Sequence, residues 1–168
     1  MASFSLTEEA GRMKKRLECL EYLAKHTVNV GLTSKASDRS KLLLAVHTHG
    51  SPAMRIPPRP VVQPALQQAS VRKEMAVCME MACEAVMEGD PEGTKAALEE
   101  AGKAGAAGIR AYIDAGIAPS NAPVTLSSGW LYNRVAKKGV KVKGKSGTTP
   151  LVDTGQLRDD FGYEIAGR

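Results

Sequence analysis

The sequence predicts an α+β fold, in which a small, mostly antiparallel sheet is packed by long α-helices. Three observations support this class. Apolar residues recur at helical spacing over 6–25, 64–88 and 91–115, and apolar residues alternate, as in half-buried strands, within 27–32 and 161–166. The composition, 43% hydrophobic and 24% charged, is that of a folded protein, and 168 residues suit a single domain over 1–168.

The N-terminal region is expected to form a helix and a β-hairpin. Residues 6–25 carry apolar side chains on one face, at Met13, Leu17 and Leu20, which predicts an amphipathic helix. The segment TVNVGLT alternates as a strand, and LLLAVHT is apolar on both faces after the polar connection SKASDRSK. We therefore expect a hairpin over 27–48.

A proline-rich arm is expected over 51–60, in the segment SPAMRIPPRP. Its prolines fix φ and remove backbone donors, so they favour an extended backbone and exclude a regular ladder. We expect the arm to project from the hairpin and dock on a neighbouring subunit. The expected contact residues are Arg55, Pro57, Pro58 and Arg59; a guanidinium pairs with a carboxylate through two hydrogen bonds, which a lysine does not reproduce.

Two helices should follow, over 64–88 and 91–115, separated by a Gly-Asp-Pro junction in which Asp90 is the N-cap of the second helix. The second helix contains three glycines at a spacing of three residues, Gly102, Gly105 and Gly108. Each costs roughly 1 kcal/mol relative to alanine in a helix interior. Either another helix, from this chain or a neighbouring copy, packs closely on this row, or the helix is flexible there.

The C-terminal region is expected to begin with Gly/Lys-rich loops over 117–149, with one short helical candidate around 128–138. A short helix and a last strand should follow over 154–166. The three cysteines lie in stretches predicted to be helical, which suits buried, reduced thiols. We find no apolar run long enough to span a membrane and expect the protein to remain in the cytoplasm of the producing cell.

The triplet formed by Asp153, Thr154 and Gly155 matches the catalytic motif of aspartic proteases. Those enzymes need strands after the triplet to build a substrate cleft, and here only 13 residues follow Gly155. The favoured interpretation is a structural cap and turn, in which Asp153 caps a short helix together with Gln156 and Gly155 permits a tight turn.

Two further motifs could carry chemistry. The segment GVKVKGKS, 139–146, matches the phosphate-binding loop pattern, but LYNRVAKK before it and GTTP after it do not supply a buried strand and a helix, so a mobile basic loop is favoured. On a strand, His47 and His49 would share a face and could hold a metal, but no third ligand is identifiable. We therefore expect no catalytic residue, cofactor or metal.

Two segments resemble the tail-completion or head-tail joining (neck) proteins of long-tailed bacteriophages. LLLAVHTHGSPAMRIPPRPVVQPAL is similar to that family's strand, His-x-x-Gly-Ser/Thr turn, Ile-Pro-x-Arg-Pro arm and Pro-initiated helix. APVTLSSGWLYNRVAKKG and TPLVDTGQLRDDFGYEI are similar to its C-terminal half. The resemblance covers roughly 27–67 and 117–166, and the chain departs from the family's usual residues at Thr48, His49 and Val61.

The resemblance implies a non-enzymatic structural virion protein at the head-tail junction. It would form a ring, hexameric or twelve-fold, of the tail-completion or tail-terminator type, and join the tail tube to the head connector in the virion. Packaged DNA is a further expected contact, and host cytoplasm is the expected location during assembly. Basic side chains expected to meet an acidic partner surface or the DNA are Lys141, Lys143 and Lys145. The alternatives are an assembly factor that aids virion morphogenesis and a basic nucleic-acid-binding module.

Overall fold

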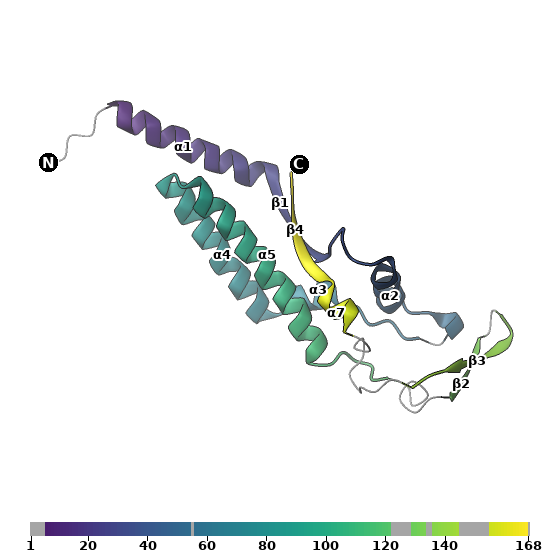
Figure 1. The fold of residues 1–168 in the computed structure, drawn as a ribbon. Coiled ribbons are helices and arrows are strands. Elements are labelled where there is room, and N and C mark those ends of the chain that lie inside the picture. The colour runs from purple at the N-terminus through teal and green to yellow at the C-terminus, as the bar shows by residue number, and fades with distance from the viewer. Residues whose placement is uncertain (1–5, 55, 122–128, 134–135, 145–154, 168) are drawn as a thin grey trace. The chain divides into compact units, whose positions relative to one another are not determined.

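The fold is α+β, as the sequence predicts (Figure 1). The computed structural model describes residues 6–54, 56–121, 129–133, 136–144 and 155–167. Its helices are α1 (Leu6–Lys25), α2 (Asp38–His49), the 3₁₀ turn η1 (Pro52–Met54), α3 (Val62–Leu66), α4 (Ala69–Glu88), α5 (Pro91–Asp114) and α7 (Gln156–Asp159). Its strands are β1 (His26–Leu32), β2 (Gly129–Asn133), β3 (Lys138–Val142) and β4 (Phe161–Gly167).

The strands form two separate two-stranded sheets. The first pairs β1 with β4, the strands nearest the two ends of the described chain. Gly162 lies against Thr33 and Gly167 against the carbonyl of Lys25, so the two strands run antiparallel. In the second sheet β2 and β3 form an antiparallel hairpin in which Trp130 faces Lys141 and Tyr132 faces Gly139.

The contacts divide the chain into two compact units, each assembled from segments that are distant in sequence. Unit 1 comprises Met1–Val30, Gln68–Ala106 and Tyr163–Arg168, and unit 2 comprises Gly31–Gln67 and Ala107–Gly162. The chain passes between the units several times, as within α5 and β1. The expectation of one domain over 1–168 therefore stays a prediction.

Unit 1 is built on helices α1, α4 and the first part of α5. α4 ends at Gly89, which is left-handed with φ 71°, and the amides of Gly89 and Asp90 bond to the carbonyls of Val86 and Ala85. This Schellman motif closes the helix, and the Asp90 carboxylate accepts from the Glu92 amide to start α5. A Cβ on residue 89 would lie 3.1 Å from Lys15 Cβ, because α1 passes close to this turn.

The glycine row of α5 is covered by strands, which corrects the expectation of a packed helix. A Cβ at Gly102 would lie 2.3 Å from Tyr163 Cδ2 in β4, and one at Gly105 would lie 3.0 Å from Val30 Cγ2 in β1. Both positions must lack a side chain because the β1–β4 sheet packs directly on the helix backbone. The third glycine, Gly108, is buried.

Unit 2 contains the larger core side chains. Ile109 and Ile113 on α5, Val61 before α3 and Phe161 at the start of β4 are each less than 2% exposed. Leu157 on α7 is also buried. The Arg110 guanidinium donates to the carbonyl of Phe161 and so links α5 to the beginning of the last strand.

The predicted hairpin over 27–48 is wrong, because its second half is helix α2. Ser37 is the N-cap: its Oγ accepts from the Ser40 amide at 3.1 Å, and Asp38 occupies the first turn. The polar segment interpreted as a turn is thus a helix start, and the apolar run Leu42–Val46 is helical. A short continuous apolar run does not distinguish the two structures by periodicity.

Two further element predictions are corrected. The helix expected over 64–88 is divided into α3 and α4, because Gln68 has extended backbone, with ψ 137°, between them. The helical candidate around 128–138 is instead the β2–β3 hairpin, within the described residues 129–133 and 136–144. The helices over 6–25 and 91–115 and the strands at 27–32 and 161–166 agree with α1, α5, β1 and β4.

Candidate functional site

Arg59 is buried inside unit 2, at 5% exposure, and does not project toward a partner as predicted. Its Nε donates to the carbonyl of Pro119 at 2.7 Å, and its Nη2 donates to that of Ser120 at 2.9 Å. Burial lowers the pKa of the guanidinium from its usual value. The fork therefore binds two backbone carbonyls of this chain, and a structural role replaces the predicted contact role.

The arm over 51–60 folds back on its own unit, which corrects the expectation of a projecting, unbonded segment. Ser51 and Ile56 exchange both backbone hydrogen bonds, at 2.8 and 2.9 Å, around η1, and the Arg59 amide donates to the carbonyl of His47. Every donor here is a residue other than proline, so the prolines do not prevent the bonding. Gly50 permits the approach, because a Cβ there would lie 2.8 Å from the Ile56 carbonyl oxygen.

Pro57 and Pro58 are exposed on the outside of this folded arm. Their role as contact residues stays a prediction. Arg55 lies outside the described residues. η1 contacts β2, so the arm and the β2–β3 hairpin are neighbours within unit 2.

The cap-and-turn segment is partly described. Asp153 and Thr154 lie outside the described residues, and Gly155 has φ 82°, the left-handed conformation that the predicted tight turn requires. Gly155 itself occupies the N-cap position of α7 and makes no side-chain cap bond. The left-handed turn at Gly155 is confirmed, whereas the predicted cap at Asp153 lies outside the described residues and stays a prediction.

Helix α7 is fixed to unit 2 by charged groups. The Arg158 guanidinium donates to both carboxylate oxygens of Asp114, each at 2.7 Å, and to Asp159 at 3.0 Å. These hydrogen bonds lower the pKa of Asp114 and raise that of Arg158. Asp160 lies near Ser37, so the end of α7 also contacts the start of α2. Arg158 therefore pairs with the carboxylate of Asp114 through two hydrogen bonds.

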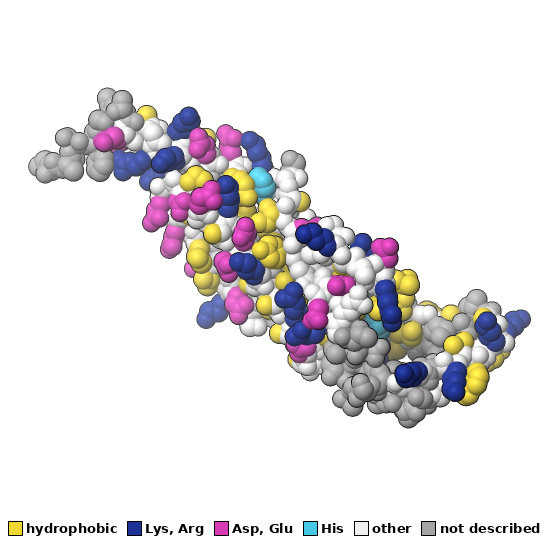
Figure 2. Space-filling model, in the orientation of Figure 1, with side chains coloured by type: hydrophobic (Ala, Val, Ile, Leu, Met, Phe, Trp, Pro, Cys, Tyr) yellow, Lys and Arg dark blue, Asp and Glu magenta, His cyan; other side chains and the backbone are white. Residues whose placement is uncertain are grey.

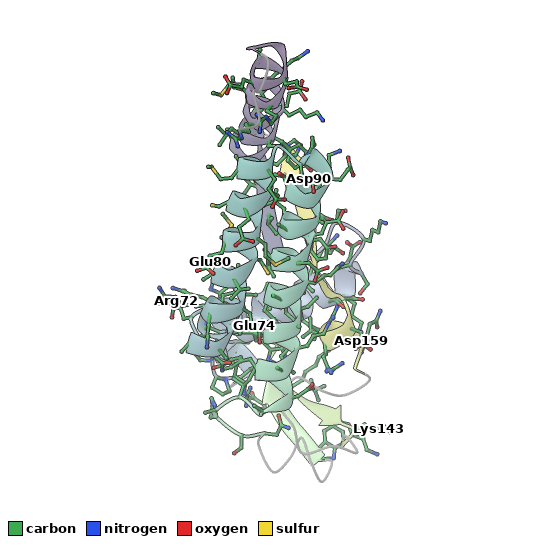
Figure 3. The ribbon with its side chains drawn as sticks, turned by 90° about the vertical axis from the view of Figure 1, so that its left-hand side faces the viewer. Arg72, Glu74, Glu80, Asp90, Lys143 and Asp159 are labelled. Atoms are coloured by element: carbon green, nitrogen blue, oxygen red, sulfur yellow. The ribbon has the colours of Figure 1, made fainter. Side chains whose placement is uncertain are left out.

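The β2–β3 hairpin exposes aromatic and basic side chains on one face. Opposite residues of an antiparallel pair share a face, as do residues two apart on a strand. Trp130, Tyr132, Gly139 and Lys141 therefore lie on one face, which we call the hairpin face. Trp130 is 71% and Tyr132 54% exposed. Lys143 follows β3 in the same alternation and extends from it in Figure 3.

The apparent phosphate-binding loop lacks the required context. Gly139 to Val142 belong to β3, where a phosphate-binding loop requires a turn after a strand, and residues 143–144 are not helical. The prediction of a mobile loop is corrected for this part, because it is a paired strand. Lys141 and Lys143 are exposed there, and Lys145 lies outside the described residues.

Large apolar side chains are exposed on the helices of unit 1. On α1 they recur at helical spacing, and on α4 they occupy more than one side of the helix. Figure 3 shows the side of α4 turned away from α5, where Arg72 and Glu80 lie. The exposed apolar residues are Met13, Leu17, Leu20, Val77, Met79, Met81 and Met87. The apolar stripe of α1 is therefore on the surface, whereas buried Cys19 lies on another face of the helix.

Charge is divided unequally between the two units. Unit 1 holds 13 acidic and 10 basic residues, and unit 2 holds five acidic and 13 basic ones. The net charge of +5 is thus the sum of −3 and +8. In Figure 2 both signs are mixed over the helices, whereas the β2–β3 hairpin shows basic and hydrophobic side chains.

The histidine and cysteine positions do not form a reactive centre. His47 and His49 lie in the last turn of α2, about 200° apart around its axis, so they do not share a face as they would on a strand. Among the described residues, no three His, Cys, Asp or Glu side chains are grouped to hold a metal. Cys19 and Cys78 are buried as predicted, and Cys83 is exposed. Burial, with smaller contributions from Glu100 and Glu74, raises the pKa of Cys78.

No family model, curated protein or solved structure matches the chain. The site is therefore interpreted from its own geometry. Within the described ranges, every helix is too short or too polar to cross a membrane.

Sequence reasoning missed the exposed aromatic pair Trp130 and Tyr132. The signal was present, because GWLYN is rich in residues that favour strands and KGVKV places Val140 and Val142 on either side of Lys141. Composition obscured it: the surrounding Gly, Ser and Lys suggested a loop.

Proposed function

We propose that the protein is a structural component of the phage head-tail junction, a tail-completion or tail-terminator type ring subunit without enzymatic activity. The observation that carries the proposal is the set of chain segments that form unit 2. It is formed by Gly31–Gln67 and Ala107–Gly162, which nearly coincide with the two segments, 27–67 and 117–166, that resemble the neck proteins. Two motifs that are remote in sequence thus belong to one folded unit.

Specific contacts join the two resembling segments. Arg59, in the Ile-Pro-x-Arg-Pro-like motif, donates to carbonyls just before the second segment's hairpin. Ser37 approaches Asp160, which follows the Asp-Thr-Gly-x-Leu-Arg motif. These contacts join residues of the two resembling segments within one unit, which supports the proposed likeness to that family.

The surface of unit 1 supports an assembly role. Several large apolar side chains on α1 and α4 are about half exposed or more, and burying them against another protein would contribute roughly 25 cal/mol per Å² of apolar area. A ring requires one face of a subunit to meet a different face of the next. In the proposed ring, hexameric or twelve-fold, the neighbours are copies of this chain. The tail tube, the head connector and packaged DNA are the other partners.

The test is deletion of the coding gene from a phage that carries it, with the protein supplied from a plasmid. We expect filled heads and separate tails without the protein, and joined virions that contain it on complementation. Leu17→Ser with Leu20→Ser should fail to complement, whereas the exposed control Glu9→Ser with Glu18→Ser should succeed. Restored virions that lack the protein would instead identify an assembly factor, and normal joining after deletion would refute the proposal.

A further inference from the structure

The hairpin face combines two exposed aromatic rings with basic side chains. Trp130 and Tyr132 lie two residues apart on β2, so their Cα atoms are roughly 6.6 Å apart on the same face. Large aromatics usually bury much of their surface, and exposure of 71% and 54% leaves these rings accessible. Within the described residues, the ammonium groups of Lys141 and Lys143 form no hydrogen bond or ion pair.

Gly139 determines how the Trp130 ring lies. A Cβ at residue 139 would be 3.2 Å from Trp130 Cε3, so the ring extends across the neighbouring strand into the space that the missing side chain leaves. The contact involves two adjacent ring atoms, Cε3 and Cζ3, and the 71% exposure of Trp130 leaves most of the ring accessible. The exposed rings of Trp130 and Tyr132 therefore offer surfaces for stacking.

The surrounding charge is of one sign. No Asp or Glu occurs between Asp114 and Asp153, and this interval contains six basic residues, Arg134, Lys137, Lys138, Lys141, Lys143 and Lys145. Those described, at 137, 138, 141 and 143, are exposed. A platform of aromatic rings within a basic segment is complementary to a polyanion that also offers flat apolar surfaces.

We propose that the hairpin face binds single-stranded nucleic acid, with bases stacked on Trp130 and Tyr132 and phosphates paired with Lys141 and Lys143. An acidic protein surface would pair with the two lysines but would not require two exposed aromatic rings. A duplex would meet the lysines but would not offer unpaired bases. The proposal rests on the hairpin face alone, and it holds whether or not the protein belongs to a phage neck.

The direct test is anisotropy of a labelled oligothymidylate titrated with purified protein. Trp130→Ala should weaken binding by about 5- to 150-fold, because stacking on one base is lost, whereas Trp130→Phe should retain most of the affinity. Lys141→Ala with Lys143→Ala should reduce the slope of log K against log salt by about 1.4. Lys14→Ala with Lys73→Ala, exposed lysines of unit 1, is the matched control and should leave binding unchanged. Circular dichroism melts verify that the variants fold.

Four outcomes would overturn the proposal. An abasic phosphodiester of equal length that binds as tightly as oligothymidylate would show that bases are not stacked, and a matched duplex that binds as tightly would lead to the same conclusion. Because Trp130 is the chain's sole tryptophan, its emission reports this site directly. A blue shift that grows with protein concentration alone would assign the hairpin face to contacts between copies. Ring formation without oligonucleotide binding would refute this site while leaving the proposed function intact.

Discussion

In unit 1 the buried apolar side chains are mostly small, whereas the four largest apolar side chains below 2% exposure, Val61, Ile109, Ile113 and Phe161, all lie in unit 2. Alanines, including Ala82, Ala85, Ala97 and Ala101, supply much of the interior of unit 1. Most leucines and methionines of α1 and α4 are instead exposed. Unit 2 therefore buries its largest apolar side chains in its own core, whereas unit 1 leaves large apolar side chains exposed.

The comparison is tested most severely by truncating one large side chain in each unit. Phe161→Ala should lower the free energy of unfolding by about 3–5 kcal/mol, because it removes a fully buried ring and leaves a cavity. Leu17→Ala, at an exposed position of unit 1, should change it by at most about 0.5 kcal/mol. Urea unfolding followed by circular dichroism measures both. Equal losses in dilute monomer would refute the contrast.

Substitution of Arg59 distinguishes a structural role of this residue from the predicted role in contacting a partner. Arg59→Ala should destabilise the protein by about 2 kcal/mol, because charge-assisted bonds to the carbonyls of Pro119 and Ser120 are lost. Arg59→Lys should recover only part of this, since an ammonium does not reproduce the planar fork. Pro57→Ala, at an exposed position of the same arm, is the control and should unfold nearly as the wild type does. If Arg59→Ala is as stable as the wild type, the structural role of Arg59 is refuted and the predicted contact role is favoured.

Two glycines in unit 1 allow its packing to be tested by adding one methyl group at each position. Gly102→Ala should destabilise by roughly 1–2 kcal/mol, because the new Cβ would meet Cγ and Cβ of Tyr163, atoms close to that residue's backbone. Gly11→Ala, in α1 with no atom within 4 Å, should stabilise by up to about 1 kcal/mol through helix propensity. Thermal melts should show shifts of opposite sign. Shifts of the same sign would contradict the strand-on-helix packing.

The smallest effect concerns the ion pair of α7 in unit 2. Because hydrogen bonding by Arg158 lowers the pKa of Asp114 in the folded state, its stabilisation is fully present above the ordinary aspartate pKa and is lost as pH falls through the lowered value. Asp114→Asn should therefore melt below wild type at neutral pH, and the two should converge in acid, below the lowered pKa of Asp114. A difference that persists unchanged in acid would show that packing, rather than charge, is responsible.

The sequence predicted an element correctly where residues at its own ends determine where it begins or stops. α5 begins at Pro91, directly after the cap Asp90, and α4 ends before Gly89, because a capping side chain, a fixed φ and a left-handed glycine act within a few residues. The strands β1 and β4 were found from alternation alone, and the turn at Gly155 from its missing Cβ. The α+β class follows from these elements together.

Tertiary contacts decided the rest. The apolar run of α2 fits a strand or a helix, and the Ser37 cap, together with contacts to Asp160 and α7, accompanies the helical outcome. Arg59 is indistinguishable in sequence from a surface arginine until the carbonyls of Pro119 and Ser120, about sixty residues away, lie beside it. Likewise, helical periodicity placed Met13, Leu17 and Leu20 on one face, but only the position of α4 left that face exposed, because burial depends on what packs against a helix and not on the helix itself.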